Sequence, residues 1–460
     1  MKILVLNGSP KGMNSVTMQY VLFLQKKFPE HEFTIESVCQ DIAKLEEDEG
    51  AFQKIIDTVR AVDAVLWAFP LYYLLVHAHY KRFIELLFER QVEQTFEGKY
   101  AAILTTSIHF FDHTAHEYVH GICDDLGMKF CGVYSAEMYD LRKEKERDRL
   151  LLFTKAFFET VEDKGTTGKK YLPAVHEDFA YQPSDQPRKI GTNGKTVVIV
   201  ADPESPEDNL ARMVERLQRS FQCEASVINL HEIRIRGGCM GCIQCGLDNR
   251  CVYQEADDIH EVYGKLMAAD ILVMAGSIKD RYLSSRWKLF FDRGFFNGHV
   301  PIFTGKQMGY LVSGPLMQLA NLRQILEAYA LCEQTNLVGI VTDECGNSDE
   351  LDCQIDDFAG RLAGCAKTGY IQPPNFLAIG GQKLFRDAIW ATMRLVFRAD
   401  HRYYKTHGIY DFPTRSVRTR VREGFLSLLL KIPSFRKEFR KRIKDEMVKP
   451  LAKVVEECEK

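Results

Sequence analysis

The sequence contains no long hydrophobic run, and no stretch approaches the roughly 20 apolar residues that a transmembrane helix requires. No secretion leader is evident, because Met1 runs directly into the apolar residues 3–6 without a basic segment or a cleavage site. Neither sign of charge dominates, since 60 lysines and arginines face 63 aspartates and glutamates. We therefore expect a globular, cytoplasmic protein, and nothing in the charge balance calls for a nucleic-acid partner.

A disulfide framework is not expected either. The chain has 13 cysteines, an odd number, and most of those outside one short loop stand in apolar or helical surroundings, as at Cys123 and Cys365. Thiols in such a setting are typical of a reducing cytoplasm.

Four of the cysteines lie in one loop. Cys239, Cys242, Cys245 and Cys251 have the spacing C-x2-C-x2-C-x5-C, which is compact enough for four thiolates to face one centre. Cysteine sulfur holds a 4Fe-4S cluster or a structural zinc tetrahedrally, but zinc sites usually place two ligand pairs a dozen or more residues apart. Three cysteines at successive two-residue gaps favour the iron–sulfur interpretation. Zinc, and thiols that bind nothing, are the alternatives.

Strand and helix patterns alternate along the chain, whose 460 residues suffice for two or three domains of about 150 residues each. Strands separated by helices form right-handed βαβ units, so we expect an α/β fold with doubly wound parallel sheets. The pattern fills residues 1–162, stops in a linker rich in glycine and proline at 163–194, and restarts in 195–370. The predicted strands are 2–6, 32–38, 64–68, 100–105 and 129–134, then 196–201, 225–230, 271–275, 308–312 and 337–342.

Residues 371–460 are predicted to form a basic helical extension. From Lys383 onward, 20 lysines and arginines face 10 aspartates and glutamates, a net charge of +10, so the rest of the chain carries −13. Helical patterns at 424–430 and 435–448 place apolar residues beside basic ones. Such helices either lie on a membrane surface or pack across the domains with a solvated basic face, and we favour packing.

The loops that follow the first, third and fourth strands are where an open parallel sheet binds its ligand. The first loop carries short polar side chains directly before a predicted helix, namely Ser9, Asn14, Ser15 and Thr17. A helix N-terminus with such donors suits a phosphate monoester. The plainer interpretation is that Ser9 and Asn14 only form the turn and cap the helix.

The other two loops are aromatic. Residues 69–75 read F-P-L-Y-Y-L-L, a proline-stiffened strand end whose backbone suits a flat heteroaromatic ring. Residues 105–111 add hydroxyl donors and a second aromatic wall, and His109 is the histidine that we expect in the pocket. We prefer it to a metal site at the three histidines that share one face of the next helix, His113, His116 and His120.

Together these loops resemble those of the flavodoxin-like NAD(P)H-dependent FMN reductases. The first loop of that family reads G-S-P-[RK]-x-x-x-N-[ST], and the third-strand loop reads P-x-Y with a lysine eleven residues after the proline, a spacing that Pro70 and Lys81 match. The resemblance implies an FMN phosphate at the first loop, the isoalloxazine ring along the third and its far side at the fourth. The residues implied are Ser9, Lys11, Asn14, Ser15, Thr17, Pro70, Leu71, Tyr72, Tyr73, Thr106 and Ser107. Tyr72 and His109 are the candidates for a catalytic role.

The two repeats depart from the family pattern in complementary ways. In the second repeat, residues 202–208 read D-P-E-S-P-E-D, and four carboxylates would repel a phosphate dianion. Counting back eleven residues from Lys288 gives Ser277 in place of the proline, so we expect that this repeat has lost FMN. Its cysteine loop resembles the run of iron–sulfur flavoproteins, whereas the first repeat offers only Cys39 at the equivalent position.

We therefore expect two tandem flavodoxin-like sheets that form an intrachain pseudo-dimer, with the FMN of one half near the 4Fe-4S cluster of the other. The resemblance implies NAD(P)H as co-substrate and a small electron acceptor of quinone, nitro or enone type, with a ferredoxin or another redox protein as a further partner. One alternative is an FMN reductase whose cysteine loop holds zinc or no metal. Another is an electron carrier whose basic tail docks an acidic partner or a membrane surface.

Overall fold

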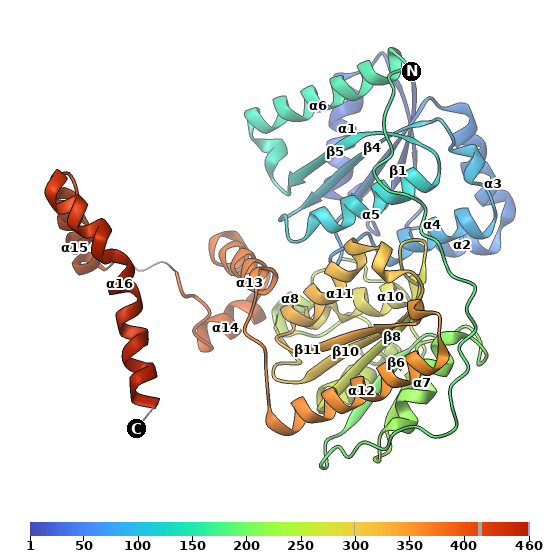
Figure 1. The fold of residues 1–460 in the computed structure, drawn as a ribbon. Coiled ribbons are helices and arrows are strands. Elements are labelled where there is room, and N and C mark those ends of the chain that lie inside the picture. The colour runs from blue at the N-terminus through green and yellow to red at the C-terminus, as the bar shows by residue number, and fades with distance from the viewer. Residues whose placement is uncertain (299, 413–415, 459–460) are drawn as a thin grey trace. The chain divides into compact units, whose positions relative to one another are not determined.

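The computed structural model describes residues 1–298, 300–412 and 416–458 and confirms two tandem α/β domains followed by helices (Figure 1). The chain divides into two compact units, Met1–Tyr404 and Lys405–Lys460. Both sheets lie in the first unit.

The first domain is a parallel sheet in the order β2-β1-β3-β4-β5, with helices on both faces. Its strands β1 and β3 are apolar and buried almost throughout, because neither face of the sheet meets solvent. The elements are β1 (Lys2–Asn7), α1 (Val16–Lys27), β2 (Glu32–Glu36), α2 (Ile42–Glu47), α3 (Glu49–Ala61), β3 (Ala64–Pro70), α4 (Ala78–Glu89), β4 (Tyr100–Ser107), α5 (Asp112–Asp125), β5 (Lys129–Glu137) and α6 (Glu144–Glu162).

The second domain repeats this topology, with strands in the order β11-β10-β8-β6-β7. The sequence analysis missed β9, which pairs antiparallel with the end of β8 through a tight turn where Asp280 and Arg281 have φ angles of 45° and 63°. The elements are β6 (Val197–Ala201), α7 (Asn209–Ser220), β7 (Ser226–Asn229), α8 (Cys245–Asp248), α9 (Ile259–Ala268), β8 (Ile271–Lys279), β9 (Tyr282–Leu283), α10 (Ser285–Arg293), β10 (Gln307–Ser313), α11 (Ala320–Cys332), β11 (Asn336–Thr342) and α12 (Ser348–Thr368).

The two domains meet along equivalent helices, α4 against α10 and α5 against α11 (Figure 1). Apolar side chains on both sides of this boundary, such as Phe83 and Tyr118 in the first domain and Phe290 and Leu322 in the second, belong to one continuous hydrophobic cluster. The domains thus share a core, as an intrachain pseudo-dimer requires.

The segment 163–194 contains no helix or strand element among its described residues, yet it packs on the second domain. Tyr181 is completely buried, and its hydroxyl donates to Asp352 at 2.5 Å. This side chain ties the connection to α12.

Helices α13 (Phe376–Ala388) and α14 (Arg398–Thr406) open the region predicted as the extension at 371–460. Helix α13 packs on α11 within the first unit. The second unit contains α15 (Val417–Leu429) and α16 (Pro433–Cys458). Positions 413–415 and 459–460 of the predicted extension lie outside the described residues. Within the described ranges, no helix is both long and apolar enough to cross a membrane.

Candidate active site

The loop between β1 and α1 presents hydrogen-bond donors at one end of a cavity. The Ser15 hydroxyl caps α1 by accepting the N–H of Met18 at 3.2 Å, and the Ser9 hydroxyl accepts the N–H of Lys11 at 3.2 Å. Ser9 therefore shapes the turn, as the plainer interpretation holds, whereas the helix cap is Ser15 and not Asn14. The first N–H groups of α1 have no carbonyl in the preceding turn to bond, so this end of the helix still suits an anion.

The cavity has a volume of ≈ 300 Å³ and lies over the carboxyl ends of β1, β3 and β4. Nine of the eleven residues implied for FMN line it: Ser9, Lys11, Ser15, Pro70, Leu71, Tyr72, Tyr73, Thr106 and Ser107. Tyr72 is also one of the two predicted catalytic candidates. The sequence motifs thus converge on one place because parallel strands end at the same edge of their sheet.

Three predicted site residues lie outside this lining. Asn14 is exposed in the short turn before α1. Thr17 is fully buried, and its hydroxyl lies 2.6 Å from that of Thr106, which it positions from behind. His109 is engaged by Asp112, whose Oδ2 is 2.8 Å from Nδ1, and this hydrogen bond raises the pKa of the histidine. His109 is therefore not among the residues that line this cavity.

The sequence analysis missed the opposite walls of the cavity. The second domain contributes Gly241, Ile243, Phe295, Gly298, Tyr329 and Cys332, and the helical region after it contributes Phe385, Met393 and Phe397. These residues have no motif in common and stand more than 100 residues from the first-domain loops in sequence. Gly241, inside the cysteine run, is the one residue whose type hints at a close approach, but the sequence does not indicate that it approaches Tyr72.

Gly241 brings the cysteine loop against the cavity wall. Its φ is +60°, and a Cβ on it would lie 2.2 Å from the Tyr72 hydroxyl oxygen and 3.0 Å from Lys11 Cε. Only a residue without a side chain permits this approach. The loop carrying the four cysteines therefore touches two of the residues implied for FMN.

The four predicted metal ligands, Cys239, Cys242, Cys245 and Cys251, line a second, small cavity together. Burial first, and neighbouring thiolates next, raise the pKa of Cys245 to about 11. Burial likewise raises the pKa of Cys239 to about 12. Thiols that lie close together with raised pKa values suit a cationic centre, which neutralises their charge as they lose their protons.

Arg293 holds the base of this loop. Its guanidinium donates to the Gly237 carbonyl at 3.0 Å and to Asp257 at 2.5 Å. It also stacks on Tyr253 at 4.1 Å and reaches the Cys251 sulfur at 3.8 Å. The cysteine loop is therefore anchored by a buried cation.

Glu333 is a buried acid behind the cavity that the sequence analysis did not find. Its Oε1 accepts the Tyr73 hydroxyl at 3.3 Å, and its Oε2 accepts the N–H of Ile302 at 3.0 Å. Burial raises the pKa of Glu333 to about 7. Because Tyr73 lines the cavity, an acid that titrates near neutral pH lies one side chain away from it.

The corresponding strand ends of the second domain are occupied by its own side chains. Asp202, the counterpart of the first-loop region, is 3% exposed and accepts the indole N–H of Trp287 at 2.7 Å. It also accepts the hydroxyl of Ser284, and burial raises its pKa to about 8. The Asp202 carboxyl group is thus engaged within the second domain.

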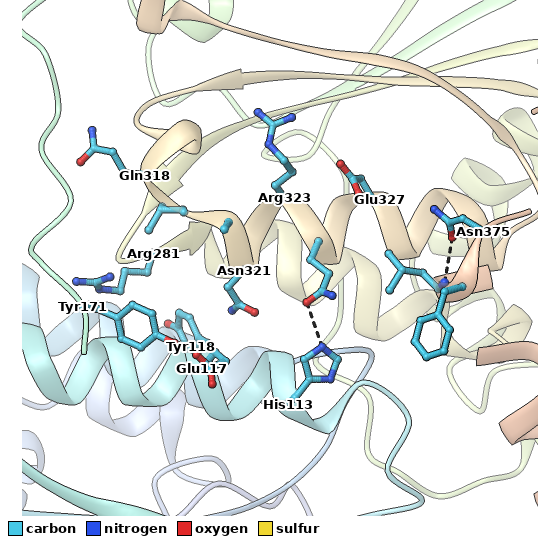
Figure 2. A pocket seen from close by; sticks show the side chains of 15 residues that line it. His113, Glu117, Tyr118, Tyr171, Arg281, Gln318, Asn321, Arg323, Glu327 and Asn375 are labelled. Atoms are coloured by element: carbon cyan, nitrogen blue, oxygen red, sulfur yellow. Dashed lines mark hydrogen bonds between the residues drawn. The ribbon is translucent and has the colours of Figure 1, made fainter. Parts of the chain in front are cut away.

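A larger cavity of ≈ 780 Å³ lies between α5 and α11 (Figure 2). Its polar side chains mostly pair with other protein groups, as His113 does with Gln324 at 3.0 Å and Arg281 with Asp125. His116 bonds Thr105 instead, so the histidines of α5 do not gather around one point. This cavity offers no convergent set of reactive groups.

Residues 1–152 match the family described as flavodoxin-like fold, and residues 195–338 match the family described as NADPH-dependent FMN reductase. The chain therefore contains two tandem flavodoxin-like domains, the second of which matches the FMN reductase family. It belongs among the NAD(P)H-dependent flavin oxidoreductases, and FMN and NAD(P)H are the cofactor and co-substrate of that group. The match to the FMN reductase family falls on the domain with the cysteine loop, whereas the cavity lies at the strand ends of the first domain.

Solved structures similar to the reductase each cover about one of its domains. An apo NADH:FMN oxidoreductase is 15% identical with a TM-score of 0.29, over 35% of this chain and 89% of that chain. FerB, an NAD(P)H:(acceptor) oxidoreductase from Paracoccus denitrificans, is 19% identical with a TM-score of 0.28, over 36% and 98%. An FMN-dependent NADH-azoreductase from Bacillus anthracis, in complex with FMN, is 11% identical with a TM-score of 0.27, over 36% and 100%. No curated protein matches the chain.

Proposed function

We propose that the reductase oxidises NAD(P)H and reduces a small acceptor of quinone, nitro or enone type, with FMN in the first domain and a 4Fe-4S cluster in the cysteine loop of the second. NAD(P)H gives up a hydride, and the acceptor gains two electrons and two protons, one of them from solvent. The observation that carries the proposal is the close approach of Gly241, in the cysteine loop, to Tyr72 in the cavity wall.

The chemistry of the cavity fits FMN. One end has the hydroxyls of Ser9 and Ser15, the N-terminus of α1 and the charge of Lys11, which together suit a phosphate dianion. The remainder is apolar and aromatic, as an isoalloxazine ring requires, with Tyr72 and Phe385 among its walls. When bound, FMN would accept a hydride and release its electrons one or two at a time.

The cysteine loop fits a cluster better than a zinc ion. Zinc at about 2.3 Å from four sulfurs would bring those sulfurs within about 4 Å of one another. Within the described part of the chain, the one group of three or more His, Cys, Asp or Glu donor atoms within 4.8 Å is Cys39, His77 and His79, not the loop cysteines. The four cysteines line one cavity, but their sulfurs lie farther apart than a zinc ion requires. This spacing favours a larger centre, such as a 4Fe-4S cluster.

The chain itself supplies a proton-bearing group at the cavity. The Tyr73 phenol lines the cavity and donates to Glu333, which lies behind it and is 4% exposed. Reduction of a quinone or nitro compound consumes protons, and this pair of side chains holds one beside the cavity.

The proposal is tested by counting iron, acid-labile sulfide, zinc and flavin in protein purified without oxygen. We expect about four iron and four sulfide per chain, the content of one 4Fe-4S cluster, and one FMN. The double variant Cys242→Ser/Cys245→Ser should lose the iron and keep the FMN. Cys353→Ser, at an exposed cysteine outside the loop, is the matched control and should keep both.

Other contents would overturn parts of the proposal. FMN with zinc, or with no metal, would leave a flavin reductase without a cluster. Two FMN per chain would contradict the assignment of the second domain. A full complement of both centres with no turnover of small acceptors would instead favour the electron-carrier alternative.

A further inference from the structure

Three further metal-ligand side chains lie together on the first domain, outside the cysteine loop and outside the lining of the FMN cavity. Cys39 follows β2, and His77 and His79 stand at the start of α4. Each offers one donor atom, and these atoms all lie within 4.8 Å of one another. Cysteine with two imidazoles is a donor set that suits zinc.

His77 is already oriented as a metal-binding imidazole would be. Its ring is completely buried, and its Nε2 lies 2.9 Å from the backbone carbonyl oxygen of Cys239. A carbonyl only accepts, so Nε2 carries the proton and Nδ1 keeps its lone pair, 3.1 Å from the Cys39 sulfur. Metal-bound histidines characteristically donate their second nitrogen to a carbonyl or a carboxylate in this way.

His79 repeats the arrangement with its nitrogens exchanged. Its Nδ1 lies 3.0 Å from the backbone carbonyl oxygen of Cys39, so Nδ1 carries the proton and Nε2 keeps its lone pair.

The room beside the two rings depends on a glycine. A Cβ on Gly238 would lie 2.8 Å from His77 Cε1 and 2.8 Å from His79 Nε2. Gly238 directly precedes Cys239, so the cysteine loop lies across the two histidines with no side chain between.

We propose that Cys39, His77 and His79 bind one Zn²⁺ ion, through the cysteine sulfur and the imidazole nitrogens that keep their lone pairs, with the fourth position open. Binding releases one proton from the Cys39 thiol to solvent and forms a zinc–thiolate bond, with no change in oxidation state. The ion replaces two contacts of His77 Nδ1. One is with the Cys39 thiol, and the other is the hydrogen bond that Nδ1 accepts from the backbone N–H of His79 at 3.1 Å.

Such an ion would fix the position of the cysteine loop. With zinc on Nδ1, the imidazole of His77 has only the Nε2 tautomer, so the hydrogen bond to the Cys239 carbonyl becomes obligatory. The inference does not require a cluster in that loop, because its three ligands all come from the first domain.

The test uses the full-length chain with Cys242→Ser and Cys245→Ser, which removes two of the four loop thiols, titrated with Co²⁺ and then with Zn²⁺. We expect one Co²⁺ per chain, with sulfur-to-cobalt charge-transfer absorption and the ligand-field bands of a tetrahedral site, displaced by Zn²⁺. Adding Cys39→Ser should abolish the charge-transfer absorption. Adding His79→Gln should weaken Co²⁺ binding by at least about tenfold.

Two controls keep the outcome interpretable. Cys123→Ser changes another fully buried cysteine of the first domain and should leave Co²⁺ binding unchanged. His79→Gln lies at a half-buried position, and circular dichroism will show whether its fold is intact. The inference is overturned if the double loop variant binds no stoichiometric Co²⁺, or if the bound ion is indifferent to both Cys39→Ser and His79→Gln.

Discussion

Asp292 of the second domain accepts a hydrogen bond from the backbone N–H of Ala78 in the first domain, at 2.7 Å. The reciprocal bond also exists, since Glu85 of the first domain accepts the N–H of Ser285 at 2.6 Å. Each carboxylate thus satisfies a free N–H in the first turn of the other domain's helix, α4 or α10. The two halves are joined by a pseudo-twofold pair of helix caps, and one of the two capping carboxyl groups, Asp292, also lines the small cavity of the four cysteines.

Asp292→Asn should destabilise the reductase strongly. Asp292 pairs with Lys288, and both side chains are completely buried. The substitution would leave a buried ammonium without its partner, which costs about 3–5 kcal/mol in the free energy of unfolding. Urea unfolding measures this change. Glu146→Gln, which breaks the ion pair with the exposed Arg149, should cost under about 1 kcal/mol. Equal effects at the two sites would refute the interpretation.

Gly241→Ala should weaken FMN binding. Its added Cβ would collide with the Tyr72 hydroxyl and force the cysteine loop away from the cavity. Gly305→Ala is the matched control, because Gly305 also has a positive φ, +82°, but no atom lies within 4 Å of the place where its Cβ would stand. Backbone strain costs both variants about 1 kcal/mol. Only Gly241→Ala should raise the FMN dissociation constant, by about tenfold or more, which corresponds to 1.4 kcal/mol.

Ser15→Asp tests the phosphate end of the cavity. Aspartate still caps the helix, as Asp208 caps α7 in the second domain, but it adds a negative charge beside the phosphate. Repulsion at about 4 Å is worth roughly 1–4 kcal/mol, so FMN affinity should fall at least about tenfold. Asn347→Asp makes the same change at the cap of α12 and should leave FMN affinity unaltered. Unchanged flavin binding in Ser15→Asp would place the phosphate elsewhere.

Glu333→Gln should change how stability depends on pH. Burial raises the pKa of Glu333 to about 7 in the folded protein, above its value of about 4.3 in an unfolded chain. Between these values the folded state binds more protons, so the free energy of unfolding falls as pH rises, by about 4 kcal/mol in total. Glutamine does not titrate, and the variant should lack this fall.

Urea unfolding at several pH values between about 4.5 and 7.5 measures the difference between wild type and Glu333→Gln. Glu207→Gln, at an exposed carboxyl, serves as the control and should keep the wild-type profile. A wild-type profile in Glu333→Gln would show that the buried carboxyl does not titrate in this range. The pH dependence of turnover in the same variant reports on the proton held at Tyr73.

The first-domain loops were predictable because their geometry is local. Residues directly after parallel strands share one edge of a sheet, so Ser9, Pro70 and Thr106 had to lie near one another once the strands were recognised. The same reasoning placed His109 in the pocket, whereas its φ is 64°, its side chain bonds Asp112, and it is not among the residues that line the cavity. A loop conformation of this kind has no signature in residue type.

The repeated α/β pattern, the donors of the first loop and the spacing of the four cysteines can all be read from the amino-acid order. The contacts of Gly241 with Tyr72, of Glu333 with Tyr73, and of Cys39 with His77 and His79 become visible only in the folded chain. The first two contacts join the two domains across as many as 260 residues of sequence, and the packing of both domains into one core brings them together. The third contact depends on the tertiary structure of the first domain alone. Residue patterns reflect interactions between residues that are close together in sequence. The second wall of the cavity forms only where the two domains meet.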